Sequence, residues 1–257
     1  MSGPSSGFDI NEYLLHHVLN SKQWHLPFLP SIELPAALTL HGLMLVLCAA
    51  LLILIFCFLY RKDARIPQGL TNLLETIIVF IRDEIAIKSL GPNDGRTMTP
   101  LLCTFFFFIL GLNLIGLVPC LATATANVNV TAALALITLS FMIFGAIYKN
   151  GFHGFMKALI PPGVPVYLLI LLVPLEFIGL FIKAFALTIR LFANMFAGHL
   201  AILTLIGLVG LLGMVALPSV ILAILISLLE ILVAFLQAYI FTLLSAMFIG
   251  QMYHPQH

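Results

Sequence analysis

Charged side chains are scarce in this chain. Lys and Arg together number 11 and Asp and Glu number 10, so 8% of the 257 residues are charged, whereas soluble domains carry about 25%. Apolar residues reach 62%, and the mean hydropathy is +1.17. This composition excludes a soluble globular domain and predicts an integral membrane protein. The net charge of +1 gives no overall field that would favour nucleic acid as a partner.

Patterns that bind metals, cofactors or nucleotides are also missing. The chain has no G-x-x-x-x-G-K-[ST] loop and neither an HExxH nor a GxSxG segment. No CxxC pair and no metal-ligand spacing is formed by the four cysteines, Cys48, Cys57, Cys103 and Cys120. We therefore expect no metal site, no cofactor and no enzyme that acts on its own.

Long apolar runs dominate the sequence instead. A helix needs roughly 20 apolar residues to cross a hydrocarbon core about 30 Å thick, and five runs stand out, at residues 41–60, 100–118, 130–148, 164–208 and 217–250. Strands of membrane barrels are shorter, with alternating segments of about 10 residues, so the expected fold class is an all-α integral membrane protein. One membrane domain, residues 41–250, follows a polar segment at 1–40 with a short amphipathic helix near Asp9 and Glu12, and precedes a tail at 251–257.

Residues 66–90 differ from these runs. Their apolar residues recur at intervals of three and four, and the charged residues between them are Glu75, Arg82, Asp83 and Lys88. We expect an amphipathic helix in the plane of the membrane interface, with a soluble-type helix packed on a partner as the alternative. The loop after the first apolar run carries Arg61, Lys62 and Arg65, so the positive-inside rule places this loop and the amphipathic helix on the inner side of the membrane. The N-terminus is then outside and the C-terminus inside.

The last two runs are too long to stand upright in a bilayer. As helices, residues 164–208 and 217–250 would reach about 65 Å and about 50 Å, well beyond a hydrocarbon core of about 30 Å. We expect two steeply tilted helices that form a hairpin, the first running from inside to outside. Two upright crossings with folded ends are the alternative.

Polar residues inside these two runs are the candidate functional residues. The first run contains Glu176, Lys183, Arg190, Asn194 and His199, and the second contains Ser227, Glu230 and Gln237. An ionisable group at that depth costs ~3 to ~10 kcal/mol, so such groups normally face a partner or water. Seven-residue spacing puts the first three on one stripe of the first helix, and Asn194 joins it at one further turn.

The order of these residues along the chain sorts them by depth. Because the first helix runs outward, Glu176 lies near the inner side and Arg190 near the middle, whereas His199 and Glu230 approach the outer side. Carboxyl and imidazole groups take and release protons, but a guanidinium remains charged. The arrangement predicts two proton half-paths that are separated by a fixed positive charge.

The segment around Arg190 resembles a known family. Residues 190–199, RLFANMFAGH, are similar to the R-L-x-x-N-x-x-A-G-[E/H] segment of the a subunit of rotary F-type ATP synthases, and Glu176 stands fourteen residues before the arginine as in that family. The stretch at 230–241 resembles the last helix of the family, and residues 113–119, NLIGLVP, resemble its N-L-x-G-x-x-P signature. The resemblance covers residues 41–247.

This resemblance implies a proton-translocating stator subunit. Arg190 would face the ring of c subunits and prevent a proton short circuit between two half-channels. Asn194, His199, Glu230 and Gln237 would line the outer path and Glu176 the inner path. The resemblance does not assign Lys183 and Ser227, which are accessory candidates by position, with a structural role as the alternative for each. Many bacterial relatives carry Glu where His199 stands and His where Glu230 stands, and the exchange leaves the joint role intact. The implied partners are the c ring, b-type peripheral stalk subunits, the rest of the F-type ATP synthase and the lipid bilayer.

A free-standing secondary transporter is the competing function. Such proteins often contain internal repeats with interrupted helices at the midplane, but no convincing repeat is visible here and five spans do not divide into equal halves. The polar N-terminal segment favours a bacterial plasma membrane, with the mitochondrial inner membrane as the alternative. Both proton and sodium stay open as the coupling ion, since the ion site would lie on the ring.

Overall fold

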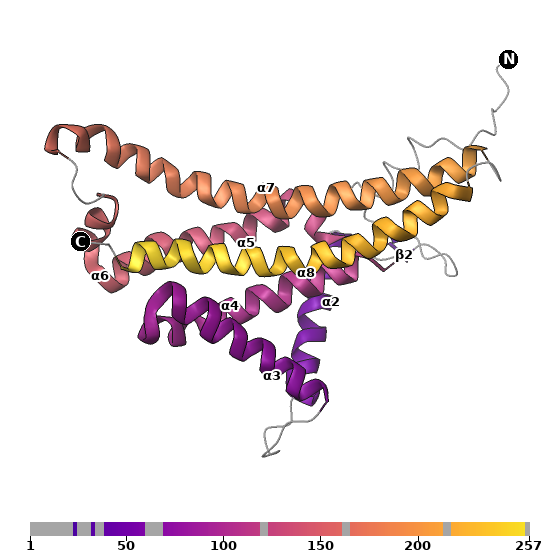
Figure 1. The fold of residues 1–257 in the computed structure, drawn as a ribbon, viewed down its shortest axis with the longest axis horizontal. Coiled ribbons are helices and arrows are strands. Elements are labelled where there is room, and N and C mark those ends of the chain that lie inside the picture. Colours follow the sequence, from indigo (N-terminus) through magenta and orange to yellow (C-terminus); the bar gives the residue numbers. More distant parts are fainter. Residues whose placement is uncertain are drawn as a thin grey trace.

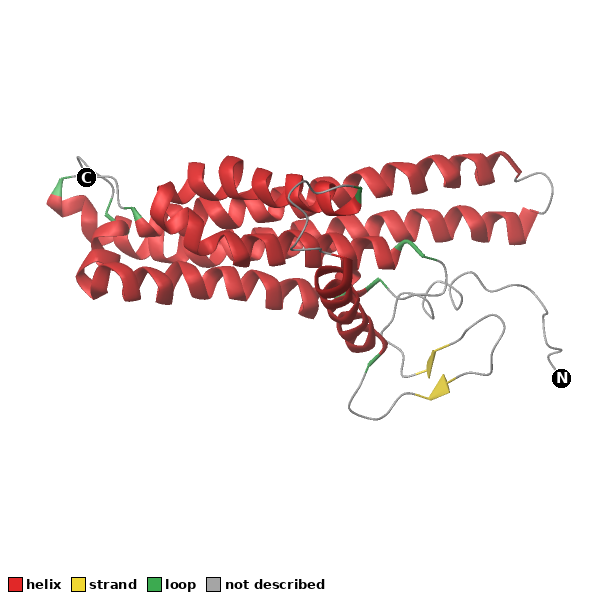
Figure 2. Ribbon diagram, turned by 90° about the horizontal axis from the view of Figure 1, so that it is seen from below, coloured by secondary structure: helices red, strands yellow, loops and turns green. Residues whose placement is uncertain are grey.

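The computed structural model describes residues 23–24, 32–33, 39–59, 69–118, 123–160, 165–212 and 217–254. Nearly all of these residues are helical, apart from one antiparallel pair of short strands, β1 (Gln23–Trp24) and β2 (Ile32–Glu33), which Figure 2 shows in yellow. Five of the described helices are long and apolar enough to cross a membrane, which confirms the predicted all-α membrane fold. The helix predicted near Asp9 and the basic residues at 61–65 lie outside the described residues.

The first membrane helix consists of α2 (Leu40–Leu54), continued by one short π-helical segment, η1 (Ile55–Leu59). Thr39 caps its N-terminus, because the Thr39 Oγ1 accepts a hydrogen bond from the Gly42 amide at 3.3 Å. Met44 and Cys48 are buried in a cluster that they share with α4 (Lys88–Gly116). The helix therefore attaches to the bundle through one face, while its other face is apolar and exposed.

The predicted amphipathic stretch forms α3 (Leu70–Phe80) and η2 (Ile81–Ile87), with η2 packed on α4. A kink at Gly91 (φ 80°, ψ 170°) separates this stretch from the remainder of α4, in a conformation that residues with a Cβ rarely adopt. The apolar run that predicts the second membrane helix begins only at residue 100. The helix instead resumes directly after Gly91, because Pro92 has the fixed φ that suits a first helical turn.

The third membrane helix is also longer than the predicted 130–148. A short helix, η3 (Ala124–Ala126), leads into α5 (Val128–Ser140), η4 (Phe141–Gly145) and α6 (Ala146–Ala158), which form one rod with a kink at Gly151 (φ 70°, ψ 172°). Beyond that kink the side chain of Phe155 is buried in the main core. Packing therefore keeps the segment that contains Lys149 and Lys157 helical as far as Ala158, beyond residue 148, where the apolar run ends.

The last two helices are α7 (Val166–Leu212), with 47 residues, and α8 (Leu217–Tyr253), with 37. Figure 1 shows them side by side and antiparallel along the length of the molecule. Each is one helix, and Pro174 lies within α7 without ending it, so the alternative of upright crossings with folded ends is wrong. Their lengths of about 70 Å and about 56 Å exceed a hydrocarbon core of about 30 Å, which keeps the expectation that both helices are steeply tilted.

The main core lies where α8 packs between α4 and α7, with α5 against α7. It is largely aromatic and aliphatic: the rings of Phe105 and Phe241, for example, meet edge to face with centroids 5.6 Å apart. One buried polar contact joins α5 to α8, between the hydroxyl oxygens of Thr138 and Ser245 at 3.0 Å. These contacts hold α8 in a fixed register, and α8 in turn supports the polar residues of α7.

Gly250 allows the closest approach between α8 and the start of α4. A Cβ at this position would overlap the backbone carbonyl of Ser89, which cannot move aside as a side-chain tip could. We expect Gly250→Ala to destabilise the chain by about 1–3 kcal/mol, the usual cost of overpacking, and to lower its melting temperature in detergent. The melting temperature is measured by size-exclusion chromatography of samples heated to a series of temperatures.

The matched control is Gly179→Ala on α7, where a new Cβ would meet no atom within 4 Å. This control should melt like the unmodified chain. Equal melting of the Gly250 and Gly179 variants would show that α8 and α4 are not in contact there.

Candidate functional site

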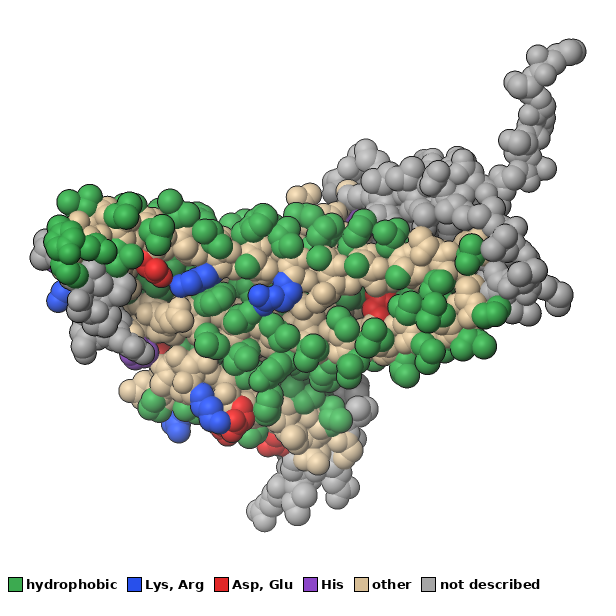
Figure 3. Space-filling view, turned by 45° about the horizontal axis from the view of Figure 1, so that its top comes forward, with side chains coloured by type: hydrophobic (Ala, Val, Ile, Leu, Met, Phe, Trp, Pro, Cys, Tyr) green, Lys and Arg blue, Asp and Glu red, His purple; other side chains and the backbone are tan. Residues whose placement is uncertain are grey.

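The candidate residues lie on the paired helices α7 and α8 within an otherwise apolar surface. Figure 3 shows this face as mostly hydrophobic, with isolated acidic and basic side chains along it. On α7 the large apolar side chains that flank the charged stripe are exposed, among them Phe185 at 66% and Ile182 at 60%. An ionisable group in such a setting needs a partner of its own, so the contacts of each one decide what it can do.

Arg190 is half-buried and lies near the middle of α7. Among the described residues it makes no hydrogen bond and no ion pair. Glu176 lies fourteen residues earlier, about 21 Å along the helix, so it is out of reach for a direct pair. The donors of the guanidinium are thus available to a group outside the described part of the chain.

Asn194 and Gln237 form a contact between the two helices one turn beyond Arg190. The Asn194 Nδ2 donates a hydrogen bond to the Gln237 Oε1 at 2.8 Å. Gln237 is only 2% exposed, and its own amide nitrogen has no partner among the described residues. The pair therefore presents a buried donor close to the arginine turn of α7.

Glu230 is the most deeply buried acidic side chain of the helix pair, at 4% exposure. Neither of its carboxyl oxygens has a hydrogen-bond partner among the described residues. It packs on the backbone of α7 at Gly198, where a Cβ would lie 2.7 Å from the Glu230 Oε1 and 2.9 Å from its Cδ. Glycine at this position leaves room for the carboxyl group, which brings it beside the turn that also carries the half-buried His199.

Asn113 of α4 is a further polar residue at this end of the bundle. It is fully buried, and its Nδ2 donates to the carbonyl oxygen of Ala234 at 3.3 Å, one turn after Glu230 on α8. Its Oδ1 has no partner among the described residues. In the sequence, Asn113 stood out only as the first residue of the segment that resembles the N-L-x-G-x-x-P signature. The fold adds it to the surroundings of Glu230.

A second polar group surrounds Glu176, nearer the start of α7. The Lys183 Nζ lies 3.4 Å from the Glu176 Oε1, as their seven-residue spacing predicts, and it also donates to the Gln251 Oε1 of α8 at 3.3 Å. Ser227, by contrast, donates to the Ala223 carbonyl within its own helix at 2.9 Å. Its hydroxyl is therefore engaged inside α8, one turn before Glu230.

Two separate groups of polar residues thus lie on opposite sides of Arg190 along α7. One contains Glu176, Lys183 and Gln251; the other contains Asn194, Gln237, Asn113, Glu230 and the Gly198–His199 turn. Each group contains a carboxyl group that can take and release a proton, whereas the guanidinium between them cannot lose its charge at any ordinary pH. This arrangement suits transfer of protons to and from a carrier that passes the arginine.

Comparison with known proteins finds the same family along most of the chain. The family described as ATP synthase A chain matches residues 42–250. A protein named ATP synthase subunit a from Anaeromyxobacter dehalogenans (strain 2CP-C) is 50% identical over 217 residues, which cover 82% of this chain and 57% of the relative. Its namesake from Chloroherpeton thalassium (strain ATCC 35110 / GB-78) is 48% identical over 259 residues, 95% of this chain and 77% of the relative.

A third protein of this name, from Myxococcus xanthus (strain DK1622), is 43% identical over 258 residues and covers 91% of this chain and 84% of the relative. The chain spans only part of the relatives' length, from 57% to 84% in these three cases. The family match nevertheless reaches all five long apolar helices, and it includes every candidate residue described above except Gln251. The chain therefore belongs to the ATP synthase A chain family.

Proposed function

We propose that this chain is the proton-translocating stator subunit of an F-type ATP synthase. It supplies two offset half-channels that load and unload carboxylates on a rotating ring of c subunits, and Arg190 prevents protons from passing directly between them. Relatives named ATP synthase subunit a support this proposal. The observation that carries it is the Arg190 guanidinium, which has no partner among the residues that the structure describes and lies between two separate polar groups.

Protons enter from the outer side past His199, Asn194, Gln237 and Glu230, and they neutralise a carboxylate on the ring. The neutral carboxylate can then travel through lipid at little cost, whereas a charged one would meet a large penalty. When it returns to the stator from the other side, Arg190 attracts its negative charge and the proton leaves past Glu176. The electrical part of the driving force is about 2.3 kcal/mol per charge for each 100 mV. Nucleotide chemistry occurs on other subunits.

The exposed apolar surface of α7 and α8 is the contact face for the ring. Side chains on both helices are widely exposed there, such as Phe185 at 66% and Leu232 at 65%, and a surface of this kind suits apolar helices of a partner or lipid. The remaining faces of the bundle contact lipid and b-type stalk subunits. The bacterial source of the relatives favours a bacterial plasma membrane, with the N-terminus outside and the C-terminus inside.

Cysteine crosslinking tests this placement of the ring. The four native cysteines are first replaced by alanine, and single cysteines are then introduced at Ala186 or Ala193, two exposed positions that flank Arg190 on α7. We expect disulfide crosslinks to a cysteine placed one turn from the ion-binding carboxylate of the c subunit. The matched control is Leu136→Cys on α5, which is 57% exposed but lies on another helix. Equal crosslinking at Leu136, or none at the α7 positions, contradicts the proposal.

A further inference from the structure

Gln251, in the last turn of α8, contacts a charged residue of the inner polar group. Its Oε1 accepts a hydrogen bond from the Lys183 Nζ at 3.3 Å. The same ammonium lies 3.4 Å from the Glu176 Oε1 and 5.6 Å from the centroid of the Phe248 ring. Two of these three contacts come from α8, so the position of Lys183 depends on the helix that α7 packs against.

Lysine would not hold this position by itself. Its side chain has many rotamers, and a partly exposed ion pair such as Lys183–Glu176, with side chains 26% and 37% exposed, contributes little to fixing it. The amide oxygen of Gln251 and the face of Phe248 add two further attractions in one direction. Together they turn the ammonium toward α8 while it remains beside the Glu176 carboxylate.

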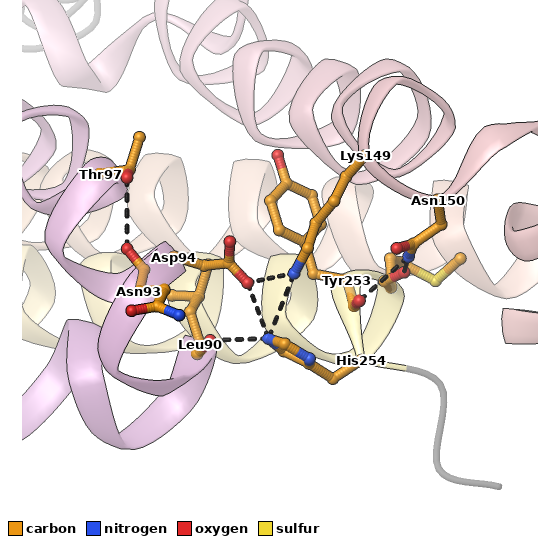
Figure 4. A network of polar contacts seen from close by, with 9 residues as sticks. Leu90, Asn93, Asp94, Thr97, Lys149, Asn150, Tyr253 and His254 are labelled. Carbon is orange, nitrogen blue, oxygen red and sulfur yellow. Dashed lines mark hydrogen bonds and ion pairs between the residues drawn. The ribbon is translucent and has the colours of Figure 1, made fainter.

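The turn that carries Gln251 is itself anchored by a C-terminal cluster, which we define as Asp94, Lys149, Asn150 and His254 (Figure 4). Lys149 forms an ion pair with Asp94, and the His254 Nε2 lies 2.8 Å from both the Asp94 Oδ2 and the Leu90 carbonyl oxygen. The Asn150 Nδ2 donates to the Tyr253 carbonyl at 3.0 Å, which satisfies one of the acceptors that a helix end leaves unpaired. The cluster ties the end of α8 to α4 and α6.

We propose that Gln251 is a positioning residue of the inner half-channel. It holds the Lys183 ammonium beside the Glu176 carboxylate, where the cation stabilises the negative charge that remains when a proton has left. The C-terminal cluster keeps Gln251 in register for this contact. The inference rests on the proposed function, because it assigns a role in the path by which protons reach the inner compartment.

The test compares two near-isosteric substitutions in the intact ATP synthase. Gln251→Met keeps the volume of the side chain but removes the acceptor oxygen, whereas Gln251→Glu keeps the acceptor. ATP-driven proton pumping is measured in inverted vesicles with a pH-sensitive dye and normalised to the amount of the subunit. We expect about a threefold fall in pumping for Gln251→Met, as for the loss of a partly exposed charge contact, and pumping near the unmodified rate for Gln251→Glu.

A role in packing alone predicts the opposite order, because methionine fits an apolar contact and glutamate does not. The same substitution in a Lys183→Met background distinguishes direct from indirect action: if Gln251 acts through Lys183, Gln251→Met causes no further loss there. Met247→Leu, at an exposed position one turn earlier on α8, is the matched control and should pump normally. Normal pumping by Gln251→Met, or an undiminished loss in the Lys183→Met background, overturns the inference.

Failure of this inference is distinguishable from failure of the proposed function. Arg190→Ala is assayed in the same vesicles. If Arg190→Ala stops pumping while Gln251→Met does not affect it, only the role of Gln251 is wrong. If Arg190→Ala pumps normally, the proposed function itself is wrong, and the inference falls with it.

Discussion

Replacing Arg190 with alanine is expected to stop ATP-driven proton pumping, with a loss of at least about 100-fold, the size found when a preorganised charge partner is removed from a water-poor site. The guanidinium has no ion pair or hydrogen bond within the described part of the chain, so its removal leaves no buried carboxylate orphaned and should not unfold the helix pair. If the proposed function holds, the substitution removes the cation that attracts each ring carboxylate as it passes. Acidification of inverted vesicles that contain the whole complex measures the effect.

Passive proton flux provides the second part of this test. If Arg190 separates two half-channels as proposed, its loss lets protons pass from one to the other on the same carboxylate. We therefore expect vesicles stripped of the catalytic sector to remain leaky while coupled pumping is absent. Lys183→Gln removes a different cation of the same helix stripe and is the matched control, with a loss of only a few-fold. Near-normal pumping by Arg190→Ala would show that this residue does not separate the two half-channels.

Replacing Glu230 with glutamine is expected to reduce proton pumping about 100-fold, the lower end of the range for losing a positioned acid or base. Glutamine has nearly the same shape but cannot take up and release a proton. The side chain is 4% exposed and its oxygens have no hydrogen-bond partner among the described residues, so the substitution breaks no protein contact there. The measurement is the initial rate of vesicle acidification at matched amounts of assembled complex.

The contact with Gly198 allows a second test, of whether the position of the Glu230 carboxyl group matters for pumping. Gly198→Ala would place a Cβ 2.7 Å from the Glu230 Oε1 and should displace the carboxyl group, with a smaller loss of pumping. Shortening the acid in the double variant Gly198→Ala/Glu230→Asp relieves this overlap and should recover part of the rate relative to Gly198→Ala alone. Full activity of Glu230→Gln would remove this residue from the proton path.

The fold class could be predicted because the lengths of apolar runs depend only on local sequence. Runs of about 20 residues or more specify membrane helices, and seven-residue spacing predicted that Lys183 and Glu176 share a stripe, where their side chains form an ion pair. The ends of helices were predicted less well. Gly91 and Gly151 act as kinks within longer rods, since the residues after them find apolar partners in the core.

Contacts between distant parts of the chain could not be predicted from periodicity. Asn113 donates to Ala234 across 121 residues, and Gln251 accepts from Lys183 across 68. Such pairs depend on how α4, α7 and α8 pack, and the sequence of one helix contains no information on its neighbour's register. The C-terminal cluster could not be predicted for the same reason, because its members come from α4, α6 and the end of α8.

The length of α7 has a consequence for how far apart its polar groups lie in the plane of the membrane. An apolar rod about 70 Å long remains inside a slab about 30 Å thick only when its axis leans about 65° from the normal. At that slope, the 23 residues from Glu176 to His199 span about 15 Å in height but about 30 Å sideways. If the proposed function holds, the inlet and the outlet would therefore open beside different hairpins of the ring, and a proton that binds at one would have to travel around the ring before it leaves at the other.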